Sequence, residues 1–451
     1  MRLTIGMPYC ELTPTGNDNP KSIQRLAKHL TMSVTKYVNA SDTEDHDCCL
    51  LESNGLTHRF RTGLLDRVRM MANTIGLNIE SEVDERHQPT SVFPVNGKEV
   101  VLRNYQQVAM DRMMKRPVGV LCAATGAGKT YMAAYMIAQR GVDTLFLVHT
   151  KDLLNQAKEA FENILGEKVG VIGDGKYDVQ RITVATMQTL SKRINTGELG
   201  DLGRRFGMII VDEVHHVPAS TFFAVSGAFS AYFVYGLSAT PDRKDGADMM
   251  IEAAAGPIIA EIETDSLMKS EDLCRVVARF IDIPAQTSYS PAPRFAVVSK
   301  YIVNNLQRNQ TIARLVKEFA ERNETVLVLV NQVKHANNLK ELMPEAEIVQ
   351  GSDKSVTRQN VWDKLRSKEI RVVISTVAKE GIDVPSLDCV ANAFGGTDNR
   401  QVIGRVLRNS KGKKMATFLD FVDWGHIRTL QNSRARMKQA KASKEFVVVN
   451  A

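Results

Sequence analysis

Short aliphatic runs that alternate with segments of helical spacing are the feature that most limits the fold of this 451-residue chain. Each run has four to seven residues, is mainly aliphatic and does not alternate with polar residues, which is typical of a parallel strand buried on both faces. Five runs come first and five follow: Val118–Cys122, Thr144–Val148, Ile182–Ala185, Met208–Val211 and Phe233–Leu237, then Thr325–Val330, Ala346–Gln350, Arg371–Ser375, Asp388–Ala393 and Ala416–Val422. The two sets predict two doubly wound α/β domains with parallel sheets.

Turn-forming residues divide the rest of the chain. We predict the first α/β domain over residues 99–260, a proline-containing connector over 261–300, the second domain over 301–440 and a tail over 441–451. Ahead of them, residues 1–85 form a small α+β module, and residues 86–98 form a linker, because the stretch Ser81–Gly97 is rich in turn-forming residues.

The module carries local signals of its own. Pro20–Leu30 and Gly63–Ile75 have helical spacing, and Ser53-Asn54-Gly55 between Asp47–Glu52 and Leu56–Arg61 predicts a hairpin. Arginines gather near the second helix, at Arg59, Arg61, Arg67 and Arg69. They are candidates either for phosphate contacts to duplex DNA or for a solvated helix face.

Composition excludes several classes of protein. No apolar stretch is long enough for a membrane-spanning helix, the N-terminus lacks the apolar core of a signal peptide, and the six cysteines form no C-x-x-C pair. We therefore expect a cytoplasmic, monomeric protein without a zinc site. Residues 401–451 hold eleven Lys or Arg against three Asp or Glu, which suggests a polyanion partner or a solvated C-terminal helix.

A phosphate-binding loop is predicted where the first strand of the first domain ends. The segment Ala123-Ala124-Thr125-Gly126-Ala127-Gly128-Lys129-Thr130 lies between a strand and the helical segment Tyr131–Gln139, which is the context that such a loop requires. The glycines let backbone N–H groups approach phosphate, and the helix N-terminus adds partial positive charge. Lys129 is expected to reach the β- and γ-phosphates and Thr130 to bind Mg²⁺.

Two acids follow the buried strand Met208–Val211. Because parallel strands end at the same edge of a sheet, Asp212 and Glu213 are expected near the phosphate loop. Asp212 is then a second Mg²⁺ ligand, and Glu213 can polarise the attacking water.

Five motifs in this order resemble those of superfamily 2 helicases, over about residues 99–430. They are Gln106, Gly128-Lys129-Thr130, Asp212-Glu213-Val214-His215, Ser238-Ala239-Thr240 and Gln401-Val-Ile-Gly404-Arg405-Val-Leu-Arg408. The resemblance implies two tandem RecA-like domains after the small module, and an enzyme that uses ATP and Mg²⁺ to move on nucleic acid.

The resemblance also implies a role for each matching residue. Adenine and phosphate contacts are implied for Arg103, Gln106, Thr125, Gly126, Ala127, Gly128, Lys129, Thr130 and Asp383, and catalytic roles for Lys129, Asp212, Glu213, Gln401, Arg405 and Arg408. Ser238 and Thr240 would couple the nucleotide state to domain movement. Nucleic-acid contacts are implied for His149, Thr150, Lys151, Thr186 and Thr376. Arg405 and Arg408 lie three residues apart, so on a helix both can face the γ-phosphate.

The variants within the motifs indicate a subgroup. Val214-His215 replaces the Ala-Asp pair of typical RNA-unwinding DEAD-box enzymes, and His149-Thr150-Lys151 resembles DNA-directed members. Asn304-Asn305, Arg308-Asn309 and Gly381-Ile-Asp-Val-Pro385 resemble the phage branch-migration helicases of the UvsW kind. That resemblance implies a DNA helicase or translocase acting on forks and four-way junctions, located in the host cytoplasm if the chain is phage-encoded.

Other classes explain less of the sequence. An RNA helicase of superfamily 2, or a duplex-DNA translocase without strand separation, would have the same two ATP-hydrolysing domains. A restriction-type motor would carry a nuclease pattern, which we do not find. A P-loop kinase or switch would lack the second α/β domain. For the N-terminal module, we predict a grip on a duplex arm at the junction; a folding cap for the first α/β domain is the alternative.

Overall fold

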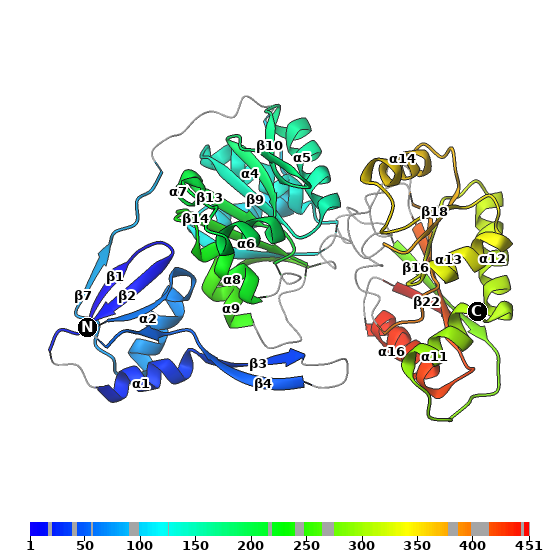
Figure 1. The fold of residues 1–451 in the computed structure, drawn as a ribbon, viewed down its shortest axis with the longest axis horizontal. Helices are drawn as coiled ribbons and strands as arrows, with labels where there is room; N and C mark the ends of the chain where they lie inside the picture. The colour runs from blue at the N-terminus through cyan, green and yellow to red at the C-terminus, as the bar shows by residue number, and fades with distance from the viewer. Residues whose placement is uncertain are drawn as a thin grey trace. The chain divides into compact units, whose positions relative to one another are not determined.

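The computed structural model describes residues 1–451 except 17–19, 38–42, 56, 90–98, 125, 215–218, 240–247, 264–274, 378–386, 398–414, 443–445 and 451. The chain forms two compact units, Met1–Ile262 and Glu263–Ala451 (Figure 1). Unit 1 contains the N-terminal module and the first α/β domain, and unit 2 contains the second α/β domain. Among the described helices, none is long and apolar enough to cross a bilayer.

The N-terminal module is a five-stranded sheet with two helices and a separate two-stranded ribbon. The sheet order is β5-β6-β2-β1-β7, and β3 pairs with β4 outside it. The elements are β1 Arg2–Ile5, β2 Tyr9–Thr13, α1 Pro20–His29, β3 Thr31–Tyr37, β4 Thr43–Cys49, β5 Glu52–Ser53, β6 His58–Arg61, the 3₁₀ helix η1 Thr62–Leu64, α2 Leu65–Ile75 and β7 Ser81–Asp84.

The first α/β domain is built on an eight-stranded sheet of order β11-β10-β12-β9-β13-β14-β8-β15, in which only β11 runs antiparallel. Its elements are α3 Asn104–Met113, β8 Val118–Ala123, α4 Lys129–Arg140, β9 Thr144–Val148, α5 Lys151–Leu165, β10 Val169–Gly173, β11 Lys176–Asp178, β12 Ile182–Thr186, α6 Met187–Asn195, α7 Leu202–Arg205, β13 Met208–Val211, α8 Ala219–Gly227, β14 Phe233–Ser238, α9 Asp248–Ala255 and β15 Ile258–Ile262.

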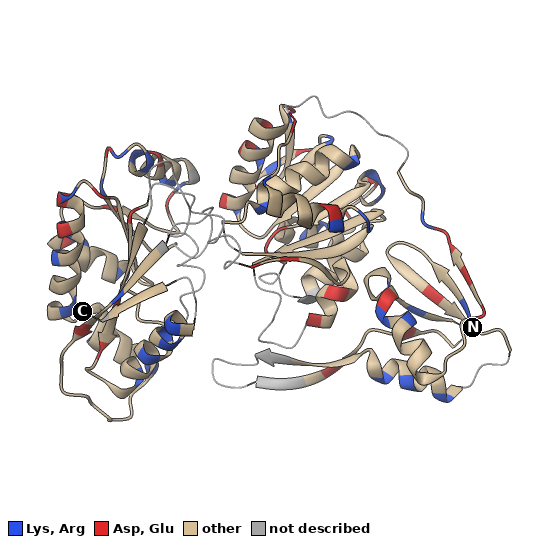
Figure 2. Ribbon diagram, turned by 180° about the vertical axis from the view of Figure 1, so that it is seen from behind, with Lys and Arg blue, Asp and Glu red and all other residues tan. Residues whose placement is uncertain are grey.

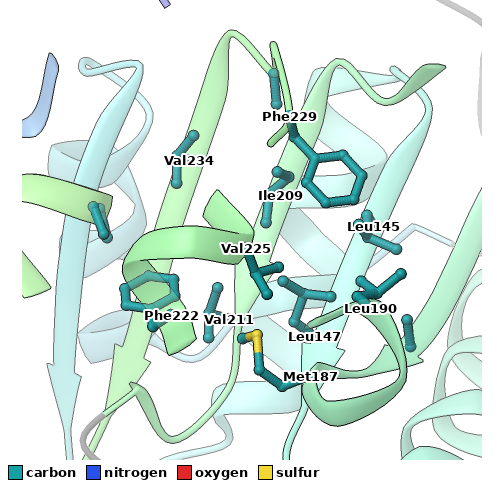
Figure 3. Packing of buried hydrophobic residues seen from close by; sticks show 14 of the residues in the cluster. Leu145, Leu147, Met187, Leu190, Ile209, Val211, Phe222, Val225, Phe229 and Val234 are labelled. Carbon is teal, nitrogen blue, oxygen red and sulfur yellow. The ribbon is translucent and has the colours of Figure 1, made fainter. Parts of the chain in front are cut away.

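One face of this sheet is covered by α6 and α8. Phe222 and Val225 of α8 pack over strand residues such as Leu147, and Met187 and Leu190 of α6 close the same layer (Figure 3). These side chains are almost fully buried, so the central strands have no polar face. This burial on both faces is the reason that the strands are mainly apolar and do not alternate.

The module shares a hydrophobic core with the first α/β domain. Met250 and Ala253 of α9 are buried in the same cluster as Leu3, Phe60 and Val68 of the module. At Gly63 an added Cβ would lie 2.0 Å from the carbonyl oxygen of Glu252, so the backbones of η1 and α9 are in direct contact. The module is therefore packed onto α9 and is not tethered through its linker alone.

Unit 2 is a seven-stranded, entirely parallel sheet of order β18-β19-β17-β20-β21-β16-β22. Its elements are β16 Arg275–Ile283, α11 Arg294–Val298, the π-helical turn η3 Ser299–Val303, α12 Leu306–Glu321, β17 Val326–Leu329, α13 Val333–Leu342, β18 Glu347–Val349, α14 Ser355–Arg366, β19 Val372–Ser375, β20 Cys389–Asn392, β21 Met415–Asp423, α16 Ile427–Ala442 and β22 Phe446–Asn450.

All ten strands predicted from aliphatic runs are present, and so is the Asn54 hairpin, in which β5 pairs with β6. Three segments differ from the expectation. Ser81–Asp84, taken as linker, is the edge strand β7 beside β1. Arg275–Ile283, placed in the connector, and Phe446–Asn450, placed in the tail, pair with each other inside the second sheet. Their partners are distant in sequence, so local composition does not reveal the pairing.

Candidate functional site

The sheet of unit 1 brings most of the motif residues to one edge. The phosphate loop follows β8, His149 follows β9, Asp212 follows β13, and Ser238 and Thr186 end β14 and β12. All these strands are parallel, so their carboxyl ends lie together. The order β9-β13-β14-β8 places the Ser238 strand between the strand of the acids and the strand of the loop.

The phosphate loop has the backbone that its glycines predict. Gly126 and Gly128 have φ values of 88° and 81°, in the left-handed region that disfavours other residues. Gly128 is also the N-cap residue of α4, so Lys129 and Thr130 lie in the first helical turn, where backbone N–H groups and the helix dipole favour an anion. Thr125 lies outside the described residues.

The side chain of Gln106 is hydrogen-bonded to the phosphate loop. Its side-chain Nε2 donates to the carbonyl oxygen of Ala127 at 2.8 Å, and its Oε1 accepts from the backbone N–H of Arg103 at 3.0 Å. A Cβ at Gly128 would lie 2.5 Å from Gln106 Nε2, so this position accepts only glycine. In this structure Gln106 therefore binds the loop itself.

Lys129 and Glu213 form the centre of the site. The Lys129 ammonium lies 3.0 Å from Glu213 Oε1, and 11% and 23% of the two side chains are exposed. Glu213 has a φ of 48°, an uncommon value for a residue with a side chain. Such strain is typical of functional positions, where the surrounding structure holds it.

Asp212 is held beside this pair. Its backbone N–H donates to the carbonyl oxygen of Leu147, and its Oδ1 accepts from the backbone N–H of Glu213 at 3.0 Å. Burial and the Glu213 carboxylate raise the pKa of Asp212 to about 6, against the opposing effect of Lys129. A bound cation would restore the ionised form, so the site favours a metal or another positive charge.

The candidate nucleic-acid residues of unit 1 take mainly local partners. Thr150 caps α5 by accepting from Leu153 N, and Lys151 pairs with Asp174 at 2.7 Å while 66% exposed. The carbonyl oxygen of His149 accepts from Gln188, and Thr186 is buried against Thr189. Lys151 is the most accessible of these four.

The structure gives each of the four module arginines a partner within unit 1. Arg59 pairs with Glu52, Arg67 with Glu252 of α9, and Arg69 with Glu82. Arg61 is 1% exposed and donates to Ser226 of α8 at 2.7 Å. Arg61 and Arg67 therefore fasten the module to the α/β domain, whereas Arg59 and Arg69 pair within the module at its surface.

Several predicted residues lie outside the described part of the chain. They are Thr125, His215, Thr240, Gly381, Asp383, Gln401, Gly404, Arg405 and Arg408. Thr376, which is described, follows β19, and its backbone N–H donates to the carbonyl oxygen of Val349.

Sequence reasoning missed the anchoring of residues 393–397, which precede the segment with Gln401. Arg308 of α12 donates to the carbonyl oxygen of Ala393, and Arg436 of α16 to that of Gly396. Both arginines are fully buried, in ion pairs with Asp423 and Asp420. The available signal was the pair of acids inside an otherwise apolar strand, since a buried carboxylate requires a cationic partner.

Two protein families match the chain, one in each unit. Residues 99–243 match the family "Type III restriction enzyme, res subunit", and residues 307–410 match "Helicase conserved C-terminal domain". With the motifs described above, these matches place the chain among the superfamily 2 helicases, enzymes that couple ATP hydrolysis to work on nucleic acid. The two parallel-sheet domains are the RecA-like pair expected for this class.

Among curated relatives, the DNA 3'-5' translocase XPB2 of Sulfurisphaera tokodaii is 27% identical over 77% of this chain and 88% of its own length. A putative ATP-dependent RNA helicase, L396, of Acanthamoeba polyphaga mimivirus is 28% identical over 74% of this chain and 66% of its own length. The DNA 3'-5' helicase XPB of Mycobacterium tuberculosis is 27% identical over 76% of this chain and 64% of its own length. The chain thus spans slightly less than two thirds of the last two proteins.

A solved structure with a TM-score above 0.5 supports the fold. Dbp5 of S. cerevisiae, bound to RNA and ADP BeF3, has a TM-score of 0.58 at 16% identity over 77% of this chain and 89% of its own. T4 UvsW is similar over 100% of this chain and 99% of its own, at 19% identity and a TM-score of 0.45.

Proposed function

We propose that this helicase is a DNA motor, and that it acts on branched DNA such as forks and four-way junctions. The observation that carries the ATP-driven part of the proposal is the Lys129–Glu213 ion pair beside Asp212, at the sheet edge that also holds the phosphate loop. A DNA substrate is supported by the names of two of the relatives, a DNA translocase and a DNA helicase.

The ion pair suggests how hydrolysis is controlled. Without nucleotide, the Lys129 ammonium neutralises Glu213, so the carboxylate is a poor general base. When ATP binds, its phosphates draw Lys129 away from the acid. Glu213 is then free to orient and deprotonate the attacking water, and a rigid backbone at its positive φ keeps it in place.

Thr130 and Asp212 are suited to hold Mg²⁺. One hydroxyl and one carboxylate are a normal protein contribution for this ion, which keeps waters and phosphate oxygens as its other ligands. The raised pKa of Asp212 fits, because a cation would compensate its buried charge. The ion would neutralise charge that develops on the transferred phosphoryl group.

Unit 2 would complete the site with Gln401, Arg405 and Arg408, and Asp383 would add a nucleotide contact. An arginine finger raises the rate on the order of 10³–10⁵-fold. Arg308 and Arg436 hold residues 393–397, which precede this segment in the sequence. Hydrolysis would then release the contact between the two domains and move the grip on nucleic acid.

The preference for branched DNA rests on the motif variants and the UvsW-like residues. Of these, Arg308 and Asn309 are buried and structural: Arg308 binds Asp423, and Asn309 donates to the carbonyl oxygen of Val303 and contacts His335. Because they are buried, these residues support the resemblance through the structure of unit 2 and not through a contact with DNA.

For the N-terminal module we propose the folding-cap role. It is supported by the core shared with α9 and by the bonds of Arg61 and Arg67 to α8 and α9. Removing residues 1–85 would expose this core, so we expect an insoluble chain. A soluble, active truncated protein that has lost only junction binding would support a grip on duplex DNA instead.

An RNA helicase is the second candidate, favoured by the mimivirus relative. One experiment separates the two: the ATPase rate with single-stranded DNA, duplex, fork, four-way junction and RNA. We expect forks and junctions to stimulate hydrolysis most. Equal stimulation by every DNA would remove the preference for branches, and stimulation by RNA alone would show that DNA is not the substrate.

A further inference from the structure

The last long helix of unit 2, α16, has two different faces. Its buried face carries Leu430, Ser433, Arg436 and Ala440. Its exposed positions include four cations, Arg428, Arg434, Lys438 and Lys441. With Gln431 between the first two, they are spaced three or four residues apart and line one side of the helix.

This row of cations is not balanced by acids. The sixteen residues of α16 contain no Asp or Glu, and Figure 2 shows blue positions along the helix without a red one. Some exposed cations elsewhere in unit 2 pair with carboxylates, as Arg314 does with Glu318 and Lys364 with Glu369. Within the described part of the chain, none of the four α16 cations lies in an ion pair with a carboxylate.

Two exposed aromatic residues lie beside the N-terminal end of the same helix. Tyr289 is 72% and Phe295 73% exposed, the highest values among the described aromatic side chains. Tyr289 is flanked by Ser288 and Ser290, whose carbonyl oxygens are bonded by the Ile427 N–H and the His426 ring. Arg428 donates to the carbonyl oxygen of Ala292, and α11, which contains Phe295, contacts α16.

Cations and aromatic rings on one surface suit a single nucleic-acid strand. Cations bind its phosphates, and aromatic rings stack on its unpaired bases, which a duplex does not offer. From residue 428 to 441 the helix rises about 20 Å at 1.5 Å per residue, enough to follow several phosphates. A protein partner would be expected to cover aromatics with apolar surface and to supply acids for the cations.

We propose that Tyr289, Phe295 and the cation row of α16 bind single-stranded nucleic acid. This surface lies outside the helicase motifs and outside the nucleotide site. The proposal rests on the proposed function only in requiring a nucleic-acid substrate. A strand held on this surface after strand separation would be bound by unit 2 independently of the phosphate loop.

The test measures binding of the full-length protein to a fluorescent 20-nucleotide DNA strand, the matching RNA strand and the blunt DNA duplex. Tyr289→Ala/Phe295→Ala should weaken strand binding about tenfold or more, since each stacked base is worth about tenfold. Its affinity for the duplex should change less than twofold. An equal loss with RNA supports the surface as well, because stacking does not depend on the sugar.

Arg434→Ala/Lys438→Ala/Lys441→Ala should weaken binding to all three probes and reduce the salt dependence, by about two in the slope of log affinity against log salt for single strands. The matched control, Arg314→Ala/Lys364→Ala/Lys368→Ala, removes the same charge from exposed sites on α12, on α14 and just after α14 that face carboxylates. Thermal unfolding establishes that each variant is folded.

Two results would overturn the proposal: unchanged strand binding in the aromatic variant, or an equal loss of binding in the control and the α16 variant. Failure of the proposed function looks different. In that case ATP hydrolysis by the unmodified protein would be stimulated by RNA alone or by no nucleic acid, whereas failure of this surface alone leaves stimulation by DNA intact in the unmodified protein and in the variants.

Discussion

The two units use buried charge differently. In unit 1, Lys129 and Glu213 remain 11% and 23% exposed, and the neighbouring Asp212 has a raised pKa. In unit 2, Arg436 and Asp420 are completely buried, and the guanidinium also donates to the carbonyl oxygens of Phe421 and Gly396. Charges that remain accessible and are incompletely compensated are suited to chemistry, whereas fully bonded pairs fix the backbone.

The largest effect tests the chemical side of this comparison. Lys129→Ala should lower ATP hydrolysis by on the order of 10³-fold, because a phosphate-binding charge is lost. Its thermal stability should change little, since Lys129 is partly exposed. The measurement is the steady-state ATPase rate with saturating DNA, with circular dichroism melting as the control. Substantial remaining hydrolysis would contradict the assignment of this site.

The next effect concerns the structural side. Arg436→Met leaves Asp420 buried without its cation and should destabilise unit 2 by about 3–5 kcal/mol. Adding Asp420→Leu to the same chain should recover much of this loss, because no charge is then left unpaired. Denaturant unfolding of both variants measures the difference. If the double variant were as unstable as the single one, the pair would matter through shape and not through charge.

Opposite pH dependences should separate the units further. Burial raises the pKa of Asp212 to about 6 from 3.8. The contribution of Asp212 to the free energy of unfolding of unit 1 is therefore complete below pH 3.8 and is lost as pH rises through 6, about 3 kcal/mol in total. Burial lowers the pKa of His335 in unit 2 to about 3 from 6.5, so stability is lost as pH falls below 6.5, about 2 kcal/mol by pH 5.

Calorimetry of the nucleotide-free protein from pH 4 to pH 8 measures both. Asp212→Asn should stabilise unit 1 at pH 8 and have no such effect at pH 4. His335→Gln should flatten the acid slope of unit 2. Identical slopes in the variants and the unmodified protein would mean that these two groups do not titrate differently in the folded state.

The smallest effect is expected where a charge pair is partly solvated. Arg67 and Glu252 join the module to α9 with 34% and 19% of their side chains exposed. A double-mutant cycle with Arg67→Ala and Glu252→Ala should give a coupling energy below about 1 kcal/mol. The shared hydrophobic core should contribute more to this junction. A coupling as large as that of Arg436 and Asp420 would remove the distinction between exposed and buried pairs.

The sequence predicted the parts that depend on local patterns. Aliphatic runs located ten strands, and the spacing from Gly126 to Thr130 located the loop whose glycines have positive φ. It did not reveal that Arg61, Arg308 and Arg436 are buried, because arginine is normally a surface residue and their partners are distant in sequence. β16 and β22 were missed for the same reason: parallel pairing depends on contacts that no local window contains.

The attachment of β15 to the phosphate loop has a mechanical consequence. β15 is hydrogen-bonded along β8, the backbone N–H of Ala124 donates to the carbonyl oxygen of Ile262, and unit 1 ends at that residue. Tension in the chain that continues to unit 2 is therefore applied to β15. This strand pairs with β8, and β8 ends in the phosphate loop. A load on the motor would strain its own nucleotide-binding backbone, so its chemistry should respond to force.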